Sequence, residues 1–377
     1  MNTLEGIIKD EISEHGPMDF ARYMGLVLYH PEHGYYASGR RRTGWRGDFL
    51  TSPELDPAYG ELWAKGFEEI WNSCGRPATF HLVELGPGEG SFAAAVLAAA
   101  TGAFADALKV ILVERVAAVR RRQREALNQF PNVAWASGIE EAGSLESACL
   151  FANEVIDNMP VALVAMSAGT PVELCVGLQD SKLALVARTP SQEVLRFIAE
   201  LSAPLPEGHL LEVPLAAIDF AAQAIAAISS GVIVVVDYGD HEGGLVQRPA
   251  GTLLCYSESG VDDQYLERPG TKDITAHANW SALTRAFESA GASVAGPIRQ
   301  RDALKSLGVD GIQDRIRVAA NDAIARGSGK DGVRALSRRG AIGALLDPAG
   351  LGGLEVLVAH KGIPAPDFMA ARRRDGT

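Results

Sequence analysis

Three glycines at alternate positions follow a short apolar run that contains an acid. Gly86, Gly88 and Gly90 lie in the segment "HLVELGPGEGSF", and Glu84 comes two residues before the first of them. Glycine allows the backbone to turn tightly and to approach a ligand closely, because no side chain projects from it. The pattern therefore predicts a nucleoside-binding turn, with an ordinary tight turn as the structural alternative.

The spacing of the glycines separates two classes of cofactor. A dinucleotide-binding loop normally reads GxGxxG, whereas here the third glycine comes one residue earlier and Ser91 takes the other position. The GxGxG form preceded by Glu84 resembles the first motif of class I methyltransferases, which bind S-adenosyl-L-methionine. That cofactor has no phosphate but carries an ammonium and a sulfonium, which nearby carboxylates suit. We therefore expect S-adenosyl-L-methionine.

Further polar residues follow the next strands of this region. Glu114 ends "KVILVE" and is the candidate acceptor for the ribose hydroxyls, although dinucleotide-binding proteins also have an acid at this place. "FANEVIDNMP" contains Asn153, Glu154 and Asp157 directly after an apolar strand. We expect Asn153 to contact the cofactor and the two acids to act in catalysis, and a helix cap is the alternative for Asn153 and Asp157.

A fifth apolar strand, "VIVVVDYG", ends in Asp237 and Tyr238, which are candidates for substrate binding. An acid held by the backbone of the following turn is the alternative for Asp237. The four cysteines show no CxxC spacing, and the histidines have no evident partners. We therefore expect free thiols and no metal site.

The elements that must position these residues alternate between strand and helix from residue 78 onward. The alternation predicts an α/β fold of the Rossmann-like class I methyltransferase type, with a doubly wound, mostly parallel sheet. The segment "VELCVGLQDSKLALVAR" is typical of a β-hairpin. We expect an N-terminal helical and lid extension at 1–76, a cofactor-binding core at 77–299, a helical insertion at 300–350, and the final strand and tail at 351–377.

Composition excludes several classes of protein. A net charge of −12 argues against general nucleic-acid binding. No apolar run reaches the roughly 18–20 residues of a membrane span. The acidic start, "MNTLEGIIKDEISEHG", lacks the basic-then-apolar order of a secretory signal, so we expect a cytoplasmic protein of bacterial type.

Several blocks occur in the order found in one family. "FARYMGLVLYHPEHGYY", "GDFLTSPELDPAYGE", "VELGPGEG", "FANEVIDNMPV", "VVDYG" and "DITAHANWSAL" together resemble the MidA-like methyltransferases. That family includes a mitochondrial protein arginine methyltransferase needed for assembly of respiratory complex I. The resemblance covers residues 15–300 well and the remainder weakly.

The resemblance implies cofactor contacts from the glycine loop, from the acid after the second strand and from the block before the second helix. Matching positions in that block are Thr51, Ser52 and Pro53 for the cofactor, and Asp48 and Glu54 for the substrate. An ordered loop that only packs on the core is the alternative. The chain departs from the family pattern at Glu89, where arginine is common, and this leaves the methyl acceptor open.

The resemblance further implies methylation of a protein arginine, on a respiratory complex I subunit or a similar protein. Glu154 and Asp157 would then hold the protonated guanidinium and accept its proton. A small-molecule or peptide-tailoring methyltransferase and a non-catalytic assembly factor are the alternatives. A nucleic-acid methyltransferase is less well supported, because the N-P-P-[YF] signature is missing. A homo-oligomer is compatible with the sequence.

Overall fold

The computed structural model describes residues 3–38 and 51–370. The chain divides into two compact units. The core unit comprises Thr43–Glu154, Gln223–Asp237 and Gly291–Thr377, and the second unit comprises Met1–Arg42, Val155–Ala222 and Tyr238–Ala290.

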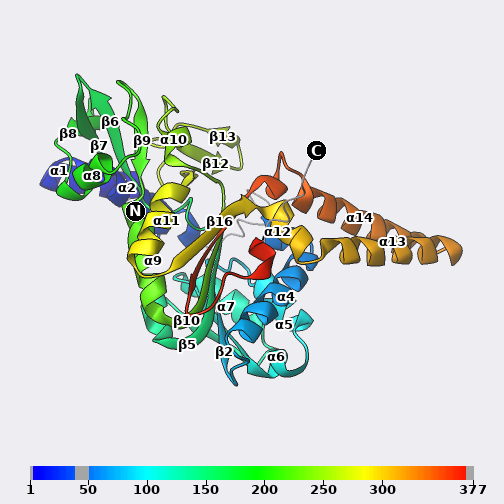
Figure 1. Cartoon of the computed structure of the whole chain (residues 1–377). Helices are drawn as coiled ribbons and strands as arrows, with labels where there is room; N and C mark the ends of the chain where they lie inside the picture. The colour runs from blue at the N-terminus through cyan, green and yellow to red at the C-terminus, as the bar shows by residue number, and fades with distance from the viewer. Residues whose placement is uncertain (1–2, 39–50, 371–377) are drawn as a thin grey trace, which may run out of the picture. The chain divides into compact units, whose positions relative to one another are not determined.

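A seven-stranded sheet forms the centre of the core unit, with the order β16-β17-β10-β5-β2-β3-β4 among the described residues (Figure 1). The parallel strands are β2 (Phe80–Leu85), β3 (Leu108–Val113), β4 (Val133–Ala136), β5 (Leu145–Asn153) and β10 (Ile228–Asp237). The antiparallel strands are β17 (Glu355–Lys361), beside β10, and β16 (Ser293–Arg299). Because β2 has β3 on one side and β5 on the other, the strand order reverses at β2 and β5, where doubly wound sheets bind ligands.

Helices cover the sheet because its strands are apolar on both faces. They are α3 (Ser52–Leu55), α4 (Ala58–Ser73), α5 (Ser91–Ala99), α6 (Gly102–Ala107) and α7 (Ala117–Ala126), with short helical turns at η2 (Ile139–Ala142), η3 (Leu351–Gly353) and η4 (Asp367–Met369). Aromatic residues of α4 and α5 bury themselves against β5, and the Phe92 and Phe151 rings stack at 4.5 Å. Such pairs add about 0.5–1.5 kcal/mol beyond the burial of their area.

The segment predicted as a helical insertion consists of α12 (Gln300–Ser306), α13 (Val309–Ala325) and α14 (Gly329–Leu346). The last two form the antiparallel pair that extends from the core unit in Figure 1. Two ion pairs join its base to the region of α3 and α4. Arg338 binds Asp56 through two hydrogen bonds of 2.9 Å, and Arg315 pairs with Glu61.

The second unit contains a five-stranded sheet among the described residues, with β1-β7-β6-β9 in order and β8 paired to β7. Its strands are β1 (Met18–Asp19), β6 (Ala162–Ser167), β7 (Thr170–Gln179), β8 (Lys182–Arg188) and β9 (Leu210–Val213). Antiparallel pairing of β7 with β8 confirms the predicted hairpin.

Short helices and small sheets complete this unit. They are α1 (Leu4–His15), α2 (Phe20–Tyr29), η1 (Tyr36–Ser38), α8 (Gln192–Ala199), α10 (Glu242–Leu245), α11 (Trp280–Ser289), β11 (Gly239–Asp240), β12 (Leu254–Ser257), β13 (Gly260–Asp262), β14 (Asp273–Thr275) and β15 (Ala278–Asn279). Helix α9 (Leu215–Ala227) crosses the boundary between the units. No described helix has the length and apolar character needed to span a membrane.

The two units do not follow the expected division of the chain. The expected N-terminal extension 1–76 splits, because α1, α2 and η1 group with the second unit and α3 and α4 with the core unit. Residues 155–222 and 238–290 of the expected core 77–299 likewise belong to the second unit. Hydrophobic periodicity reports the type of an element but not the sheet that it joins, so sequence alone did not separate these insertions.

Candidate active site

The core sheet brings three of the predicted polar side chains to one face at its carboxyl edge. Glu84, Glu114 and Asn153 continue the two-residue period of buried core side chains on β2, β3 and β5. The ends of these strands are neighbours, since Leu85 pairs with both Val113 and Ala152. An acid, a second acid and an amide therefore adjoin the point where the strand order reverses.

The glycine loop lies directly after β2 and uses backbone conformations that favour glycine. Gly86, Gly88 and Gly90 have φ values of +62°, +53° and +83°. Helix α7 supports the loop from behind, where the fully buried Gln123 donates from Nε2 to the Gly88 carbonyl over 2.7 Å. Trp135 in turn donates to Gln123 Oε1 over 3.0 Å, which fixes the orientation of the amide.

Glu89, the departure from the family pattern, has a partner on α7, the helix that also carries Gln123. Arg122 Nε lies 3.0 Å from Glu89 Oε2 and Arg122 Nη2 lies 2.8 Å from Glu89 Oε1, so the pair is bidentate. Such a pair has a defined geometry as well as a favourable charge interaction. The negative charge of Glu89 in the loop is thus paired with the positive charge of Arg122 on α7.

Glu84 is a buried acid near the end of β2. Its side chain is 5% exposed, and Oε2 has no hydrogen-bond partner among the described residues. Burial raises the pKa of this carboxyl well above its ordinary value of 4.5. A buried acid without a partner is costly, and a cationic ligand group that ionises it would remove that cost.

Glu114 lies at the end of β3, where its backbone N–H extends the sheet by donating to the Ala136 carbonyl over 3.0 Å. Its Oε1 accepts a 2.7 Å hydrogen bond from the Val116 N–H. Burial raises the pKa of the Glu114 carboxyl, and the hydrogen bond from Val116 partly offsets that rise. A carboxylate offers about four acceptor positions, so this one retains capacity for ribose hydroxyls.

The end of β5 holds Glu154 in an unusual backbone conformation. Its φ is +53°, which is uncommon for a residue other than glycine, and its N–H donates to the Val236 carbonyl over 2.8 Å. Asn153 Nδ2 donates to Glu154 Oε1 over 2.9 Å. Unfavourable backbone conformations that the surrounding structure maintains often mark functional sites.

The segment 51–56, which precedes α4, is attached to the site at several points. Ser52 is fully buried and accepts a 3.0 Å hydrogen bond from Gln300. Glu54 accepts a 2.9 Å hydrogen bond from Ser91, the residue that follows the glycine loop. Thr51 precedes α3 as its N-cap residue, and Pro53 lies in its first turn. Asp48 lies outside the described residues.

The remaining catalytic and substrate-binding candidates are distributed differently. Asp237 is fully buried in β10, but the two-residue period places it on the opposite face of the sheet from Asn153. Asp157 and Tyr238 belong to the second unit, where Asp157 is buried and Tyr238 is exposed. The roles of all three stay predictions.

In the second unit, a buried network joins three of the blocks on which the resemblance rests. The Tyr36 hydroxyl lies 2.9 Å from both Asn158 Oδ1 and Asp273 Oδ2. Asn158 Nδ2 donates to Asp273 Oδ1 over 2.9 Å, and the Asp157 carbonyl accepts from the Ala276 N–H over 2.8 Å. This network fixes the backbone around Asp157.

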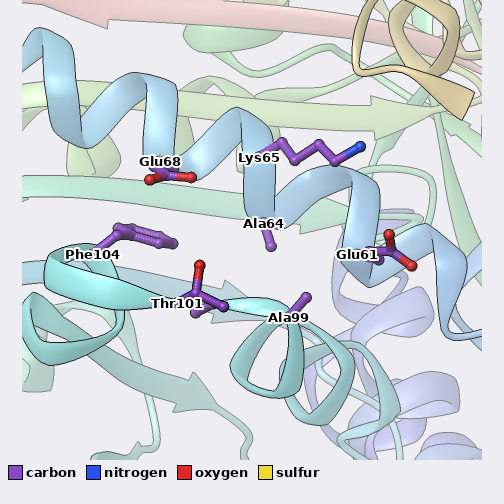
Figure 2. A pocket seen from close by; sticks show the side chains of 8 residues that line it. Glu61, Ala64, Lys65, Glu68, Ala99, Thr101 and Phe104 are labelled. Atoms are coloured by element: carbon purple, nitrogen blue, oxygen red, sulfur yellow. The ribbon is translucent and has the colours of Figure 1, made fainter. Parts of the chain in front are cut away.

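A surface hollow of about 240 Å³ lies between α4 and the far end of α5 (Figure 2). Its lining comprises Glu61, Ala64, Lys65, Glu68, Ala99, Ala100, Thr101 and Phe104. The glycine loop precedes the first residue of α5, whereas the hollow adjoins its last, and a nine-residue helix is about 13 Å long. The hollow is therefore not the predicted cofactor site.

The sequence did not identify three residues that support the site. Gln123 lies in an arginine-rich segment and Tyr59 among the apolar residues of α4, so neither stands out in the sequence. Gln300 lies far along the chain, and its amide reaches Ser52 through the fold alone. A glutamine that is fully buried is a signal for such a role, but burial is visible only in the structure.

The sheet order, the glycine loop and the acids at the carboxyl edge define a class I methyltransferase, as predicted. A model of the family described as "Putative S-adenosyl-L-methionine-dependent methyltransferase" matches residues 62–298. The chain belongs to this family, and it is an S-adenosyl-L-methionine-dependent methyltransferase.

Relatives and solved structures agree with this assignment. The mitochondrial protein arginine methyltransferase NDUFAF7 of Rattus norvegicus is 29% identical and aligns with 80% of this chain and 73% of its own length. The protein of that name from Homo sapiens is 29% identical, with 80% and 72% covered. A superfamily member from Burkholderia thailandensis, crystallised with S-adenosyl-homocysteine, is 29% identical with a TM-score of 0.85, and 98% of this chain and 94% of that chain are covered.

The residues at the edge of the sheet fit S-adenosyl-L-methionine. Glu84 Oε2 is a buried acceptor without a described partner, and the three glycines of the loop have left-handed backbone and no side chains. A Cβ at Gly90 would lie 3.2 Å from Leu127, so the loop is closely packed from behind. We propose that Glu84, Glu114, Asn153 and the glycines hold the cofactor.

The Glu84→Gln variant tests the role of the buried acid. Burial raises the pKa of Glu84 in the folded protein above its value of about 4.3 in the unfolded chain. The protonated Glu84 side chain therefore contributes fully to the free energy of unfolding below about pH 4.3, and this contribution is lost as the pH rises through the pKa of the folded state. Glutamine does not titrate. Without cofactor, the Tm of the variant minus that of the wild type should therefore increase from pH 5 to pH 8 in thermal scans.

The same substitution should weaken cofactor binding, because glutamine cannot supply the negative charge that a cationic ligand requires. Calorimetry with S-adenosyl-homocysteine at pH 8 measures this loss. Parallel Tm curves combined with unchanged affinity would show that Glu84 is only a structural residue.

Proposed function

We propose that this methyltransferase transfers a methyl group to an arginine side chain of a protein, with a respiratory complex subunit or a similar protein as the acceptor. The observation that carries the proposal is the carboxylate of Glu154, held in left-handed backbone beside Asn153 at the carboxyl edge of the sheet. The relatives named protein arginine methyltransferase support the choice of acceptor.

An arginine acceptor requires a carboxylate at the reacting group. The guanidinium is protonated at neutral pH, because its pKa exceeds about 12. A carboxylate can bind its nitrogens, orient one of them and accept the proton that is released as the nitrogen becomes methylated. We assign this role to Glu154, with Asp157 as the second candidate.

S-adenosyl-L-methionine, when bound, supplies an activated methyl group, so the protein's task is to position the acceptor and to control charge. Glu84 would offer its carboxylate to the positive end of the cofactor, and Glu114 would accept from the ribose hydroxyls. Thr51, Ser52 and Pro53 are proposed as further cofactor contacts, and Asp48 and Glu54 as substrate contacts. Glu54 already accepts a hydrogen bond from Ser91 beside the glycine loop.

The predicted compartment remains a bacterial-type cytoplasm. The relatives are named mitochondrial, and that name describes those proteins. General nucleic-acid binding is not part of this proposal, because the net charge is −12.

Transfer of a labelled methyl group tests the proposed function. A lysate from cells that lack this gene is incubated with the purified enzyme and methyl-labelled S-adenosyl-L-methionine and separated into a protein fraction and a small-molecule fraction. The protein fraction is then hydrolysed to amino acids. We expect the label in methylarginine, in one or a few proteins. Label only in small molecules would favour a tailoring enzyme, and no label in either fraction would contradict methyl transfer.

A further inference from the structure

A series of side-chain contacts at hydrogen-bond distance joins the segment 51–56 to the end of β5. Gln300 Nε2 donates to Ser52 Oγ over 3.0 Å. The Tyr59 hydroxyl lies 2.9 Å from Gln300 Oε1 and 2.7 Å from Asn153 Oδ1. Asn153 Nδ2 then donates to Glu154 Oε1 over 2.9 Å. Every member belongs to the core unit.

The orientations of both amides in this chain follow from their other partners. Gln300 Nε2 also donates to the Leu351 carbonyl over 2.8 Å, so a rotated amide would place two acceptors against each other there. Asn153 Nδ2 faces the carboxylate of Glu154, which has no proton to donate when it is ionised. Both amides therefore present their oxygen atoms to Tyr59.

Tyr59 consequently has two acceptors for one proton. Its side chain is fully buried, and burial raises the pKa of its hydroxyl well above the ordinary value of 10.0, so it remains a donor. Donation to Asn153 withdraws the proton from Gln300, and the reverse also holds. The hydroxyl thus links the orientation of Asn153 to the attachment of the segment 51–56.

We infer that Tyr59 is a positioning residue for methyl transfer, which holds Asn153 and, through it, the carboxylate of Glu154, and connects that carboxylate to Ser52 by way of Gln300. This inference rests on the proposed catalytic role of Glu154. We assign Tyr59 a role that acts through Asn153, which joins its hydroxyl to Glu154. The ring of Tyr59 has a separate task, since it packs at 5.7 Å from Phe92.

The Tyr59→Phe variant removes the hydroxyl and keeps the ring. Single-turnover transfer to proteins from cells that lack the gene should slow about ten-fold, which corresponds to loss of one buried hydrogen bond in the reactive arrangement. The affinity for S-adenosyl-homocysteine should fall less than the rate, because Glu84, Glu114 and the glycines are unchanged and, of these proposed cofactor contacts, Asn153 alone loses a hydrogen-bond partner.

A double-mutant cycle with Glu154→Gln tests whether Tyr59 acts through Glu154. In the Glu154→Gln background, adding Tyr59→Phe should produce little further loss, because the group that it positions no longer accepts a proton. Independent, multiplicative losses would overturn the inference, as would a normal rate for Tyr59→Phe alone.

Tyr23→Phe is the matched control. Tyr23 is also fully buried, and its hydroxyl donates to the Tyr265 carbonyl over 2.7 Å in the second unit. We expect this variant to retain the wild-type transfer rate even if its Tm falls. An equal loss of rate in both variants would show that any buried hydroxyl deletion slows the enzyme, and it would overturn the inference.

Hydrogen exchange without cofactor gives a readout independent of activity. Tyr59→Phe and Gln300→Leu should both increase exchange in peptides covering residues 51–58, whereas Tyr23→Phe should not. Unchanged exchange in Tyr59→Phe would remove the link to Ser52.

The two levels of proposal fail differently. A normal rate for Glu154→Gln would remove the catalytic role of Glu154, and with it this inference. A slow Glu154→Gln combined with independent effects of Tyr59→Phe would leave the proposed function intact and overturn only the positioning role.

Discussion

Glu154→Gln is expected to lower methyl transfer by at least ten-fold while leaving cofactor affinity nearly unchanged. General base groups contribute about 10²–10⁴-fold to catalysed reactions, and glutamine has no basic oxygen for the guanidinium proton. Glutamine retains the length of the side chain and an oxygen that can accept from Asn153 Nδ2, so the local hydrogen bond persists. Single-turnover transfer and calorimetry with S-adenosyl-homocysteine measure the two quantities.

Glu125→Gln provides the control for the change of charge. Glu125 lies exposed on α7 and outside the proposed site, so its variant should match wild type in rate and in affinity. Normal turnover by Glu154→Gln would remove this residue from the mechanism. A parallel loss of cofactor affinity would instead assign Glu154 to cofactor binding.

Gly90→Ala is expected to reduce affinity for S-adenosyl-homocysteine by at least about ten-fold, or 1.4 kcal/mol. The backbone at Gly90 has a φ of +83°, and a Cβ there would lie 3.2 Å from Leu127, which α7 and the core hold in place. The atoms around the new Cβ must give by a few tenths of an ångström, and we expect the glycine loop to shift, and with it the surface proposed to face the cofactor. Calorimetry and urea unfolding measure the losses in affinity and stability.

Gly75→Ala is the control that separates the effect of backbone strain from the effect on the cofactor site. Gly75 has the same φ of +83°, but a Cβ there would have nothing within 4 Å. Both variants should lose about 1–2 kcal/mol of stability from the left-handed backbone, and only Gly90→Ala should lose affinity. Equal affinity in the two variants would contradict the assignment of the glycine loop to the cofactor.

The polar residues at strand ends could be predicted from the sequence because they interrupt or end an apolar run. Glu84, Glu114 and Asn153 each follow or end such a run, and the structure places them on one face of neighbouring strands. The doubly wound sheet was also predictable, since alternating strands and helices leave few topologies. Asp237 ends a strand in the same way, yet it lies on the other face because its position in the two-residue period differs by one.

Long-range partners could not be predicted in this way. Gln123 supports Gly88, and Gln300 binds Ser52, through contacts that depend on tertiary packing rather than on local pattern. Tyr59 fits the apolar face of α4, so its hydroxyl gave no separate signal. The second unit was missed for a related reason, because the hairpin of β7 and β8 was recognised but its sheet partners were not.

Protein methylation in cells carrying the wild-type gene, the Glu154→Gln allele or no gene tests the central claim most directly. Mass spectrometry should find an arginine methylated in the wild type and unmethylated in both other strains, although the Glu154→Gln protein is present and binds its cofactor. Identical arginine methylation in all three strains would contradict the proposed activity.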